Sequence, residues 1–256
     1  MGKARPPSPA TVPAFELLSP ETGTTYFIFV EAPATPGPVQ VMIFLDGDDQ
    51  FRFASGAHRE LVAAGQIAPL LLVGVGYGAS YRAPGNRRGR DYTPTAMPGE
   101  TDTGGADAFL RFLTATLWTE LKRRYVVDES LRGLGGHSLG SLLALHALFQ
   151  PAPFFQRFLV SSPSIWFDDR SLLRLAARHR DAQDTLPARV FLSLGEEDSP
   201  SMSGDLDLLE EQLRHRPYQF LDMVRARYPG RDHYNVVPLA FREGLKALFG
   251  HEQRQP

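Results

Sequence analysis

The chain has 256 residues, of which 43% are hydrophobic and 22% charged; this ordinary globular usage excludes a disordered or fibrous protein. Its 27 basic and 29 acidic residues give a formal net charge of −2, so the charge balance indicates neither a nucleic-acid nor a membrane partner. The absence of cysteine excludes disulfides, thiolate metal sites and a cysteine nucleophile. Residues 1–15 lack the apolar core of a signal peptide, and no window is apolar enough to span a membrane, so we expect a cytoplasmic protein.

Prolines punctuate the start of the chain and predict a flexible tail over residues 1–13, followed by one domain over residues 14–256. Apolar runs rich in β-branched and aromatic residues predict strands at 24–31, 39–46, 70–77, 131–137, 158–162, 189–195 and 218–228. Segments with an apolar stripe at helical spacing, or apolar throughout, predict helices at 105–125, 138–148, 171–180, 204–214 and 237–249.

The order of these elements predicts the fold class. Two strands are followed by repeated strand–helix units, which is typical of an α/β domain with a mostly parallel sheet and helices on both faces. Several predicted strands are continuous apolar runs, as expected for a sheet covered on both sides. Residues 78–104 form the exception, because they have no period and contain several glycines, prolines and arginines. A loop of that length is usually functional or disordered.

The most informative motif is GHSLG at residues 136–140, which joins a predicted strand to a helix that is apolar nearly all round. Strand, sharp turn and helix are what a nucleophile elbow requires. The glycines at positions 136 and 140 are needed because a Cβ there would come too close to the turn. Ser138 would then lie at a helix N-terminus, which favours developing negative charge. The alternative is that Ser138 simply caps the helix.

A serine nucleophile needs a histidine base, which in this fold follows an acid in chain order. His233 is the candidate, because it lies in the turn after the last strand, at the carboxyl edge of the sheet. His137 and His146 belong to the elbow and its helix and precede any acid. The others are interpreted as solvated side chains on polar helix faces or in the tail: His58, His179, His215 and His251.

Three neighbouring carboxylates follow the strand that precedes this one, at positions 196–198. Asp198 is the first choice for the acid, because by that residue the turn has curled back toward the sheet edge; Glu196 is the second. Asp232 is adjacent to His233 and is not expected to reach its ring nitrogen. In this interpretation Ser138 attacks, His233 carries the proton, and the carboxylate fixes the imidazole tautomer.

An oxyanion hole requires two N–H groups aimed at one point. We expect one from Leu139, directly after the nucleophile, and the other from Asp48, in the loop after an early central strand. That loop could instead be a polar turn, or its three aspartates a metal cluster, although no further ligands at suitable spacing support a metal. Residues 74–79 match a loose dinucleotide pattern, but no helix can open after them, so no nucleotide cofactor is expected.

Six motifs together resemble the putative-esterase family of α/β-hydrolases: LDG at 45–47, RDYTPT at 90–95, GGADAF at 104–109, GHSLG at 136–140, SSPSIW at 161–166 and DHYNVVP at 232–238. The branch with siderophore trilactone esterases (enterobactin, salmochelin and bacillibactin hydrolases) is the most similar. The similarity runs over residues 24–249, with the motifs in the expected order.

The resemblance implies that Ser138 and His233 are nucleophile and base, that Asp48 and Leu139 are oxyanion donors, and that residues 14–256 are one catalytic domain without metal or cofactor. Some relatives are described as working with a Ser–His pair alone, so a dyad stays open beside the acid. Ser141 replaces a glycine of many relatives, which should affect only the packing behind the elbow.

The arginines of the 78–104 segment fit this resemblance. Arg87, Arg88 and Arg90, together with Arg82, would pair and stack with an anionic planar ligand such as a ferric tris-catecholate. Trp166 would add an aromatic wall to the site. The alternative is a solvated arginine loop with Trp166 in the core.

The sequence therefore predicts a serine carboxylic-ester hydrolase that acts on a small-molecule, siderophore-like ester or lactone through an acyl-enzyme. Within the same fold, the alternative is a general carboxylesterase or acyltransferase acting on small acyl esters or S-formylglutathione-like thioesters. In another class, it is a non-catalytic binding protein on a hydrolase scaffold.

Overall fold

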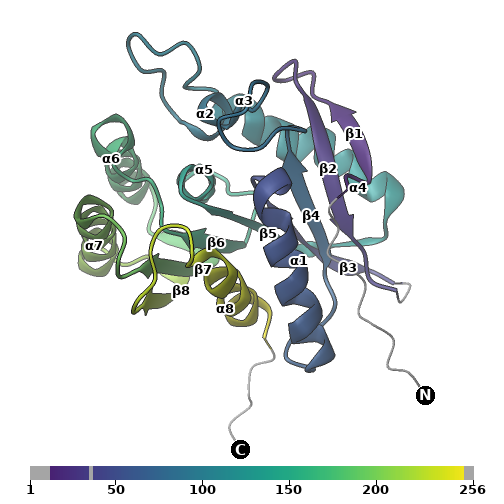
Figure 1. Cartoon of the computed structure of the whole chain (residues 1–256). Coiled ribbons are helices and arrows are strands. Elements are labelled where there is room, and N and C mark those ends of the chain that lie inside the picture. The colour runs from purple at the N-terminus through teal and green to yellow at the C-terminus, as the bar shows by residue number, and fades with distance from the viewer. Residues whose placement is uncertain (1–11, 35–36, 251–256) are drawn as a thin grey trace, which may run out of the picture.

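The structure, a computed structural model, describes residues 12–34 and 37–250 (Figure 1). Most of the predicted N-terminal tail, residues 1–11, and His251 lie outside the described residues. Eight strands form one sheet in the order β1-β2-β4-β3-β5-β6-β7-β8. Their bounds are β1 Phe15–Leu18, β2 Thr25–Glu31, β3 Val39–Phe44, β4 Leu71–Gly76, β5 Val127–His137, β6 Arg157–Ser161, β7 Thr185–Gly195 and β8 Gln219–Tyr228. β1 and β2 are antiparallel to their neighbours, and the pairings from β4 to β8 are parallel.

Helices cover both faces of the sheet, as predicted. Their bounds are α1 Gly47–Ala63, α2 Arg88–Tyr92, α3 Ala106–Arg111, the π-helical η1 Phe112–Leu117, α4 Trp118–Arg124, α5 Leu139–Leu148, α6 Phe167–Ala182, α7 Pro200–His215 and α8 Val237–Phe249. α1 and α8 lie side by side on one face (Figure 1). The other helices with apolar faces share the core on the opposite face.

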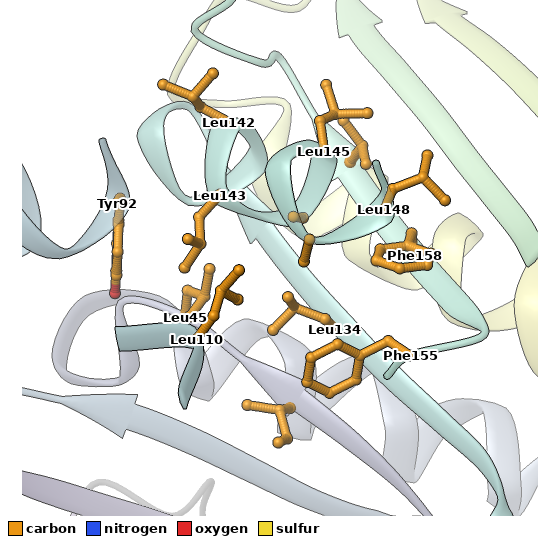
Figure 2. Close-up of a cluster of buried hydrophobic side chains, with 14 of the residues drawn as sticks. Leu45, Tyr92, Leu110, Leu134, Leu142, Leu143, Leu145, Leu148, Phe155 and Phe158 are labelled. Carbon is orange, nitrogen blue, oxygen red and sulfur yellow. The ribbon is translucent and has the colours of Figure 1, made fainter. Parts of the chain in front are cut away.

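Helix α5 is surrounded by other elements. Leu143 and Leu148 point into a cluster with Leu134 of β5 and Phe158 of β6, whereas Leu142 projects from the opposite side of the helix (Figure 2). α2, α3 and α6 cover its remaining sides. Each buried leucine stabilises the fold by roughly 1.5–3 kcal/mol. The helix that begins directly after Ser138 is therefore held rigidly against the sheet.

All seven predicted strands are found, with ends shifted by a few residues, but three elements were not predicted: β1, α1 and α2, the last of which lies inside the 78–104 segment. β1 is a four-residue edge strand. α1 begins inside the segment predicted as a loop with an oxyanion donor, because Asp46 adopts a left-handed conformation with φ 55° and a helix starts directly after it. Its buried Phe51, Ala54 and Leu61 follow a helical spacing that was available in the sequence.

The interpretation of His58 and His179 as solvated was wrong. His58 is buried, with Nδ1 2.7 Å from the Glu31 carboxylate and Nε2 accepting the Leu70 N–H at 3.0 Å. His179 is also buried, and its Nδ1 lies 2.9 Å from the Tyr218 hydroxyl. Both occupy the inward side of helices whose outward sides are polar. Among the helices of residues 12–34 and 37–250, none is both long enough and apolar enough to span a membrane.

Candidate active site

Ser138 has the backbone geometry of a nucleophile elbow. It lies between the end of β5 and the start of α5 with φ 58° and ψ −120°, a strained conformation for a residue with a side chain. A Cβ on Gly136 would lie 2.6 Å from the carbonyl carbon of Gly140, and one on Gly140 would lie 3.3 Å from Asp46 Oδ2. The turn is therefore as crowded as the motif predicts, and the pairing of β5 with β3 and β6 holds it in place.

Ser141 ties this elbow to the sheet. Its Oγ accepts a hydrogen bond from the Ser161 N–H at 2.7 Å and lies 2.7 Å from the Gly136 carbonyl oxygen. The hydroxyl thus links the first turn of α5 to both β5 and β6. The departure from the family's glycine adds a hydrogen-bonded connection behind the elbow, and its effect is not limited to packing.

His233 and Asp198 are paired. His233 Nδ1 lies 2.8 Å from Asp198 Oδ1, and the Asp198 side chain is only 2% exposed. Glu196, the second choice for the acid, is exposed to solvent. Burial is the largest influence and raises the pKa of Asp198, but hydrogen bonding, first from His233, and the neighbouring histidines together outweigh it and hold the pKa below its usual value. Asp198 therefore faces the ring as an ionised carboxylate.

The turns that carry these two residues are bonded to each other. The Glu196 N–H donates to the Tyr228 carbonyl at 3.0 Å, and the Glu197 N–H donates to the Arg231 carbonyl at 2.9 Å. The Asp232 carboxylate instead accepts the N–H groups of the two residues after His233, at 2.8 and 2.7 Å. Asp232 therefore shapes the histidine turn, and Asp198 approaches the ring from the neighbouring strand end.

His137 packs against the candidate base. The ring centroids of His137 and His233 lie 4.4 Å apart, and His137 Nδ1 lies 3.0 Å from Ser161 Oγ. Burial lowers the pKa of His137 to about 3, and the neighbouring His233 acts in the same direction. His137 is therefore a neutral ring behind His233 at physiological pH.

This buried neutral histidine predicts a pH-dependent stability. Unfolding exposes His137, which then takes up a proton below its ordinary pKa of about 6.5, whereas the folded form stays neutral until about pH 3. The stabilisation is thus complete above pH 6.5 and is lost as the pH falls, by about 2 kcal/mol at pH 5. Urea unfolding of the wild type and of His137→Gln from pH 7 to pH 5 should show the stability difference narrowing by that amount. If the unfolding free energies of the two proteins changed equally with pH, the assignment of His137 as a buried neutral ring would be contradicted.

Two helix N-termini meet beside Ser138. β3 and β5 are adjacent and parallel, so α1 and α5 begin at the same sheet edge. The first N–H groups of a helix have no acceptor within the helix, and Asp48 and Leu139 occupy such positions in α1 and α5. The Asp48 carboxylate accepts the N–H groups of Tyr77 and Gly78 at 2.6 and 3.1 Å, which fixes the start of α1 against the segment after β4.

The three aspartates near this N-terminus have separate protein partners. The buried Asp46 forms a bidentate ion pair with Arg88, at 2.8 and 3.0 Å. Asp49 accepts the Ser80 hydroxyl and, at 3.0 Å, the Tyr81 N–H. In the described part of the chain, no group of three or more acidic or histidine side chains could hold a metal ion. The alternative of an aspartate metal cluster therefore has no geometric support.

A cleft of about 790 Å³ contains both Ser138 and His233 in its wall. Its charged and aromatic lining includes Asp49, Arg52, Phe53, Tyr81, Arg82, Arg88 and Tyr234. The guanidinium of Arg88 is committed to Asp46, whereas no described carboxylate lies within ion-pair distance of Arg52 or Arg82. A second groove of about 860 Å³, between β8 and α8, contains neither Ser138 nor His233.

The predicted substrate-binding residues are only partly brought to this cleft. Arg88 lines it, but Arg87 and Arg90 are not among its lining residues. Arg90 donates to the buried Asp91 at 2.7 Å and to Thr24 Oγ1 at 2.8 Å. Arg87 is half-exposed, with its nearest carboxylate oxygen, on Asp102, 4.0 Å away. Trp166 is 49% exposed, so the alternative that it belongs to the core is wrong, but it does not line the cleft.

Two residues of the site, Ser164 and Arg52, were not predicted from the sequence. Ser164 Oγ lies 3.2 Å from Ser138 Oγ, and Arg52 belongs to the unpredicted helix α1. The SSPSIW motif was one available signal, since its serines follow a strand adjacent to the elbow. An apolar period from Phe51 to Leu61 was the other, because it would have placed Arg52 on a helix at the sheet edge.

An α/β fold with a strained serine elbow, a histidine after the last strand and a buried carboxylate on that histidine defines the class of α/β-hydrolases. The family model described as "Putative esterase" matches residues 19–238, and the chain belongs to that family. It is an esterase.

Known relatives cover nearly the whole chain. The ferri-bacillibactin esterase BesA of Bacillus subtilis (strain 168) is 28% identical over 92% of this chain and 90% of its own length. The siderophore triacetylfusarinine C esterase of Aspergillus fumigatus is 29% identical over 95% of this chain and 96% of its own length. Among solved structures, the BES protein from Bacillus cereus has a TM-score of 0.84 with 26% identity, over 98% of this chain and 99% of that one.

Proposed function

We propose that this esterase hydrolyses siderophore-like esters or lactones, with Ser138 as nucleophile, His233 as base and Asp198 as the acid of a triad. The observation that carries the proposal is the 2.8 Å contact of Asp198 with His233, beside a strained Ser138 in the same cleft. Residues 14–256 act as one catalytic domain, and no cofactor takes part in the reaction.

The proposed reaction proceeds through an acyl-enzyme. His233 Nε2 takes the hydroxyl proton as Ser138 Oγ attacks the ester carbonyl carbon, and it then gives that proton to the departing alkoxide. A water attacks the acyl-serine in the same way and releases the carboxylic acid. The N–H groups of Asp48 and Leu139 stabilise the oxyanion, because both belong to unsatisfied helix N-termini at one sheet edge.

The substrate class is supported by the names of the relatives and by the charge of the cleft. Arg52 and Arg82 are exposed and have no described carboxylate within ion-pair distance, and the guanidinium of Arg52 lies over the Phe53 ring, 4.6 Å from its centroid. Such guanidinium groups suit an anionic aromatic ligand such as a catecholate. The role expected of Arg87, Arg88 and Arg90 is therefore better supplied by Arg52 and Arg82, since Arg88 is already paired.

The wild type is expected to open a catecholate trilactone to its linear trimer, and the double variant Arg52→Gln/Arg82→Gln should raise KM for that substrate. Each exposed charge pair contributes on the order of 1 kcal/mol, which together correspond to roughly a 30-fold increase. A small neutral ester such as p-nitrophenyl acetate should be hydrolysed with nearly unchanged KM. Steady-state kinetics at two ionic strengths check this, because salt should weaken only the binding of the anion.

Arg87→Gln is the matched control, since this half-exposed arginine does not line the cleft. It should leave both substrates unaffected. Equal changes in KM for the trilactone and the neutral ester would contradict anion recognition and favour a general carboxylesterase. Failure of the wild type to cleave any trilactone would do the same.

A further inference from the structure

The end of β6 and the segment directly after it present one serine to each part of the proposed catalytic machinery. Ser161 Oγ lies 3.0 Å from Nδ1 of His137, whose ring packs on His233. Ser164 Oγ lies 3.2 Å from Ser138 Oγ. Between them lies Ser162, whose buried hydroxyl has no hydrogen-bond partner among the described residues. β6 pairs with β5 on one side and β7 on the other, so this segment lies between the nucleophile turn and the acid turn.

Ser162 is held in an unusual conformation. It is fully buried, and its φ of 45° lies in the left-handed region that residues with a side chain rarely adopt. Its N–H donates to the Ser193 carbonyl of β7 at 2.8 Å, which fixes the backbone against that strand. Asp198 follows the same strand and donates its own N–H to Gly195 at 3.1 Å. Strain of this kind concentrates at functional positions.

Two buried polar atoms between these turns lack hydrogen-bond partners among the described residues: Ser162 Oγ and Asp198 Oδ2. The other oxygen of Asp198 accepts from His233. A carboxylate oxygen can only accept, whereas a serine hydroxyl carries a proton that rotates freely. Burial raises the pKa of Asp198, while the hydrogen bond from His233 and then the nearby Ser162 hydroxyl lower it, so Ser162 and Asp198 are close enough to interact. Pairing them satisfies both atoms at once, and buried polar groups are rarely left unsatisfied.

We propose that Ser162 is a positioning residue whose hydroxyl donates to Asp198 Oδ2 and thereby holds Oδ1 toward His233 Nδ1. The inference rests on the proposed role of Asp198 as the acid. With one carboxylate oxygen anchored by Ser162 and the other by His233, the carboxylate cannot rotate away from the ring. In this proposal the left-handed backbone conformation of Ser162 directs its hydroxyl toward the turn that carries Asp198.

The test compares Ser162→Ala and Ser162→Gly with Ser193→Ala in hydrolysis of p-nitrophenyl acetate. Both Ser162 variants should lower kcat about 10-fold with KM unchanged, as expected for loss of one orienting hydrogen bond. Ser162→Gly relieves the positive φ and should unfold at the same or a higher temperature than Ser162→Ala, so a loss of kcat in it cannot come from a damaged fold. Ser193 is the matched control, because it is buried on the next strand and its hydroxyl reaches only a backbone carbonyl. Its variant should keep the wild-type kcat.

A double-mutant cycle separates positioning of the acid from other effects. Adding Ser162→Ala to Asp198→Asn should lower kcat no further, because the carboxylate that Ser162 orients is gone. Multiplicative losses would overturn the inference. The inference would also be overturned if Ser162→Gly kept the wild-type kcat while Asp198→Asn was slow. That outcome would leave the proposed triad intact. Wild-type kcat in Asp198→Asn would instead refute the acid itself, and the inference with it.

Discussion

Ser138→Ala is expected to reduce ester hydrolysis by a factor on the order of 10⁶ while the protein stays folded. The reason is that the covalent route disappears with the Oγ, and only binding and the oxyanion donors remain. Alanine keeps the Cβ of the native residue, so it occupies the strained backbone at φ 58° without new contacts. The measurement is kcat for p-nitrophenyl acetate, together with stoichiometric labelling of the wild type by a fluorophosphonate.

Ser141→Ala and Ser138→Gly are the controls for this experiment. Ser141→Ala removes a buried hydroxyl behind the elbow and should reduce stability while leaving a nucleophile that can be labelled. Ser138→Gly relieves the positive φ, so it should be at least as stable as Ser138→Ala and equally inactive. A folded Ser138→Ala protein with turnover near that of the wild type would exclude Ser138 as the nucleophile and revive the interpretation of a simple helix cap.

Asp198→Asn is expected to lower kcat by roughly 10⁴, as the analogous change does in serine proteases. An amide at the position of Oδ1 can present its N–H₂ to His233 Nδ1, which stabilises the wrong imidazole tautomer. KM should change little, because Asp198 is buried behind the histidine and does not line the cleft. Steady-state kinetics of the purified variant separate the two constants.

Glu196→Gln is the matched control for the acid, since this exposed carboxylate stands two residues before Asp198. It should keep the wild-type kcat. If neither variant were slow, the chain would work as a Ser–His dyad. If only Glu196→Gln were slow, the acid would have to be reassigned, against the 2.8 Å contact of Asp198 with the ring.

Local pattern was sufficient to select the proposed nucleophile and the proposed base. The elbow is encoded within five residues, because two glycines and a serine between a strand and a helix specify one tight turn. His233 could be selected because its position after the last strand places it at the carboxyl edge of a parallel sheet. The apolar runs also predicted seven strands, since burial on both faces leaves a strong signal in each run.

The acid, the free arginines and the buried histidines depended on tertiary structure. The sequence ranked Asp198 above Glu196 only on the expected curl of the turn, whereas the bonds between the β7 turn and the histidine turn are what direct Asp198 inward. Arg88 is as basic as Arg52, but it is bound to Asp46, a residue 42 positions away. A charge pattern shows which side chains exist, whereas their partners are decided by segments that only folding brings together. The same reason placed Ser162 beside Asp198, across two neighbouring strand ends.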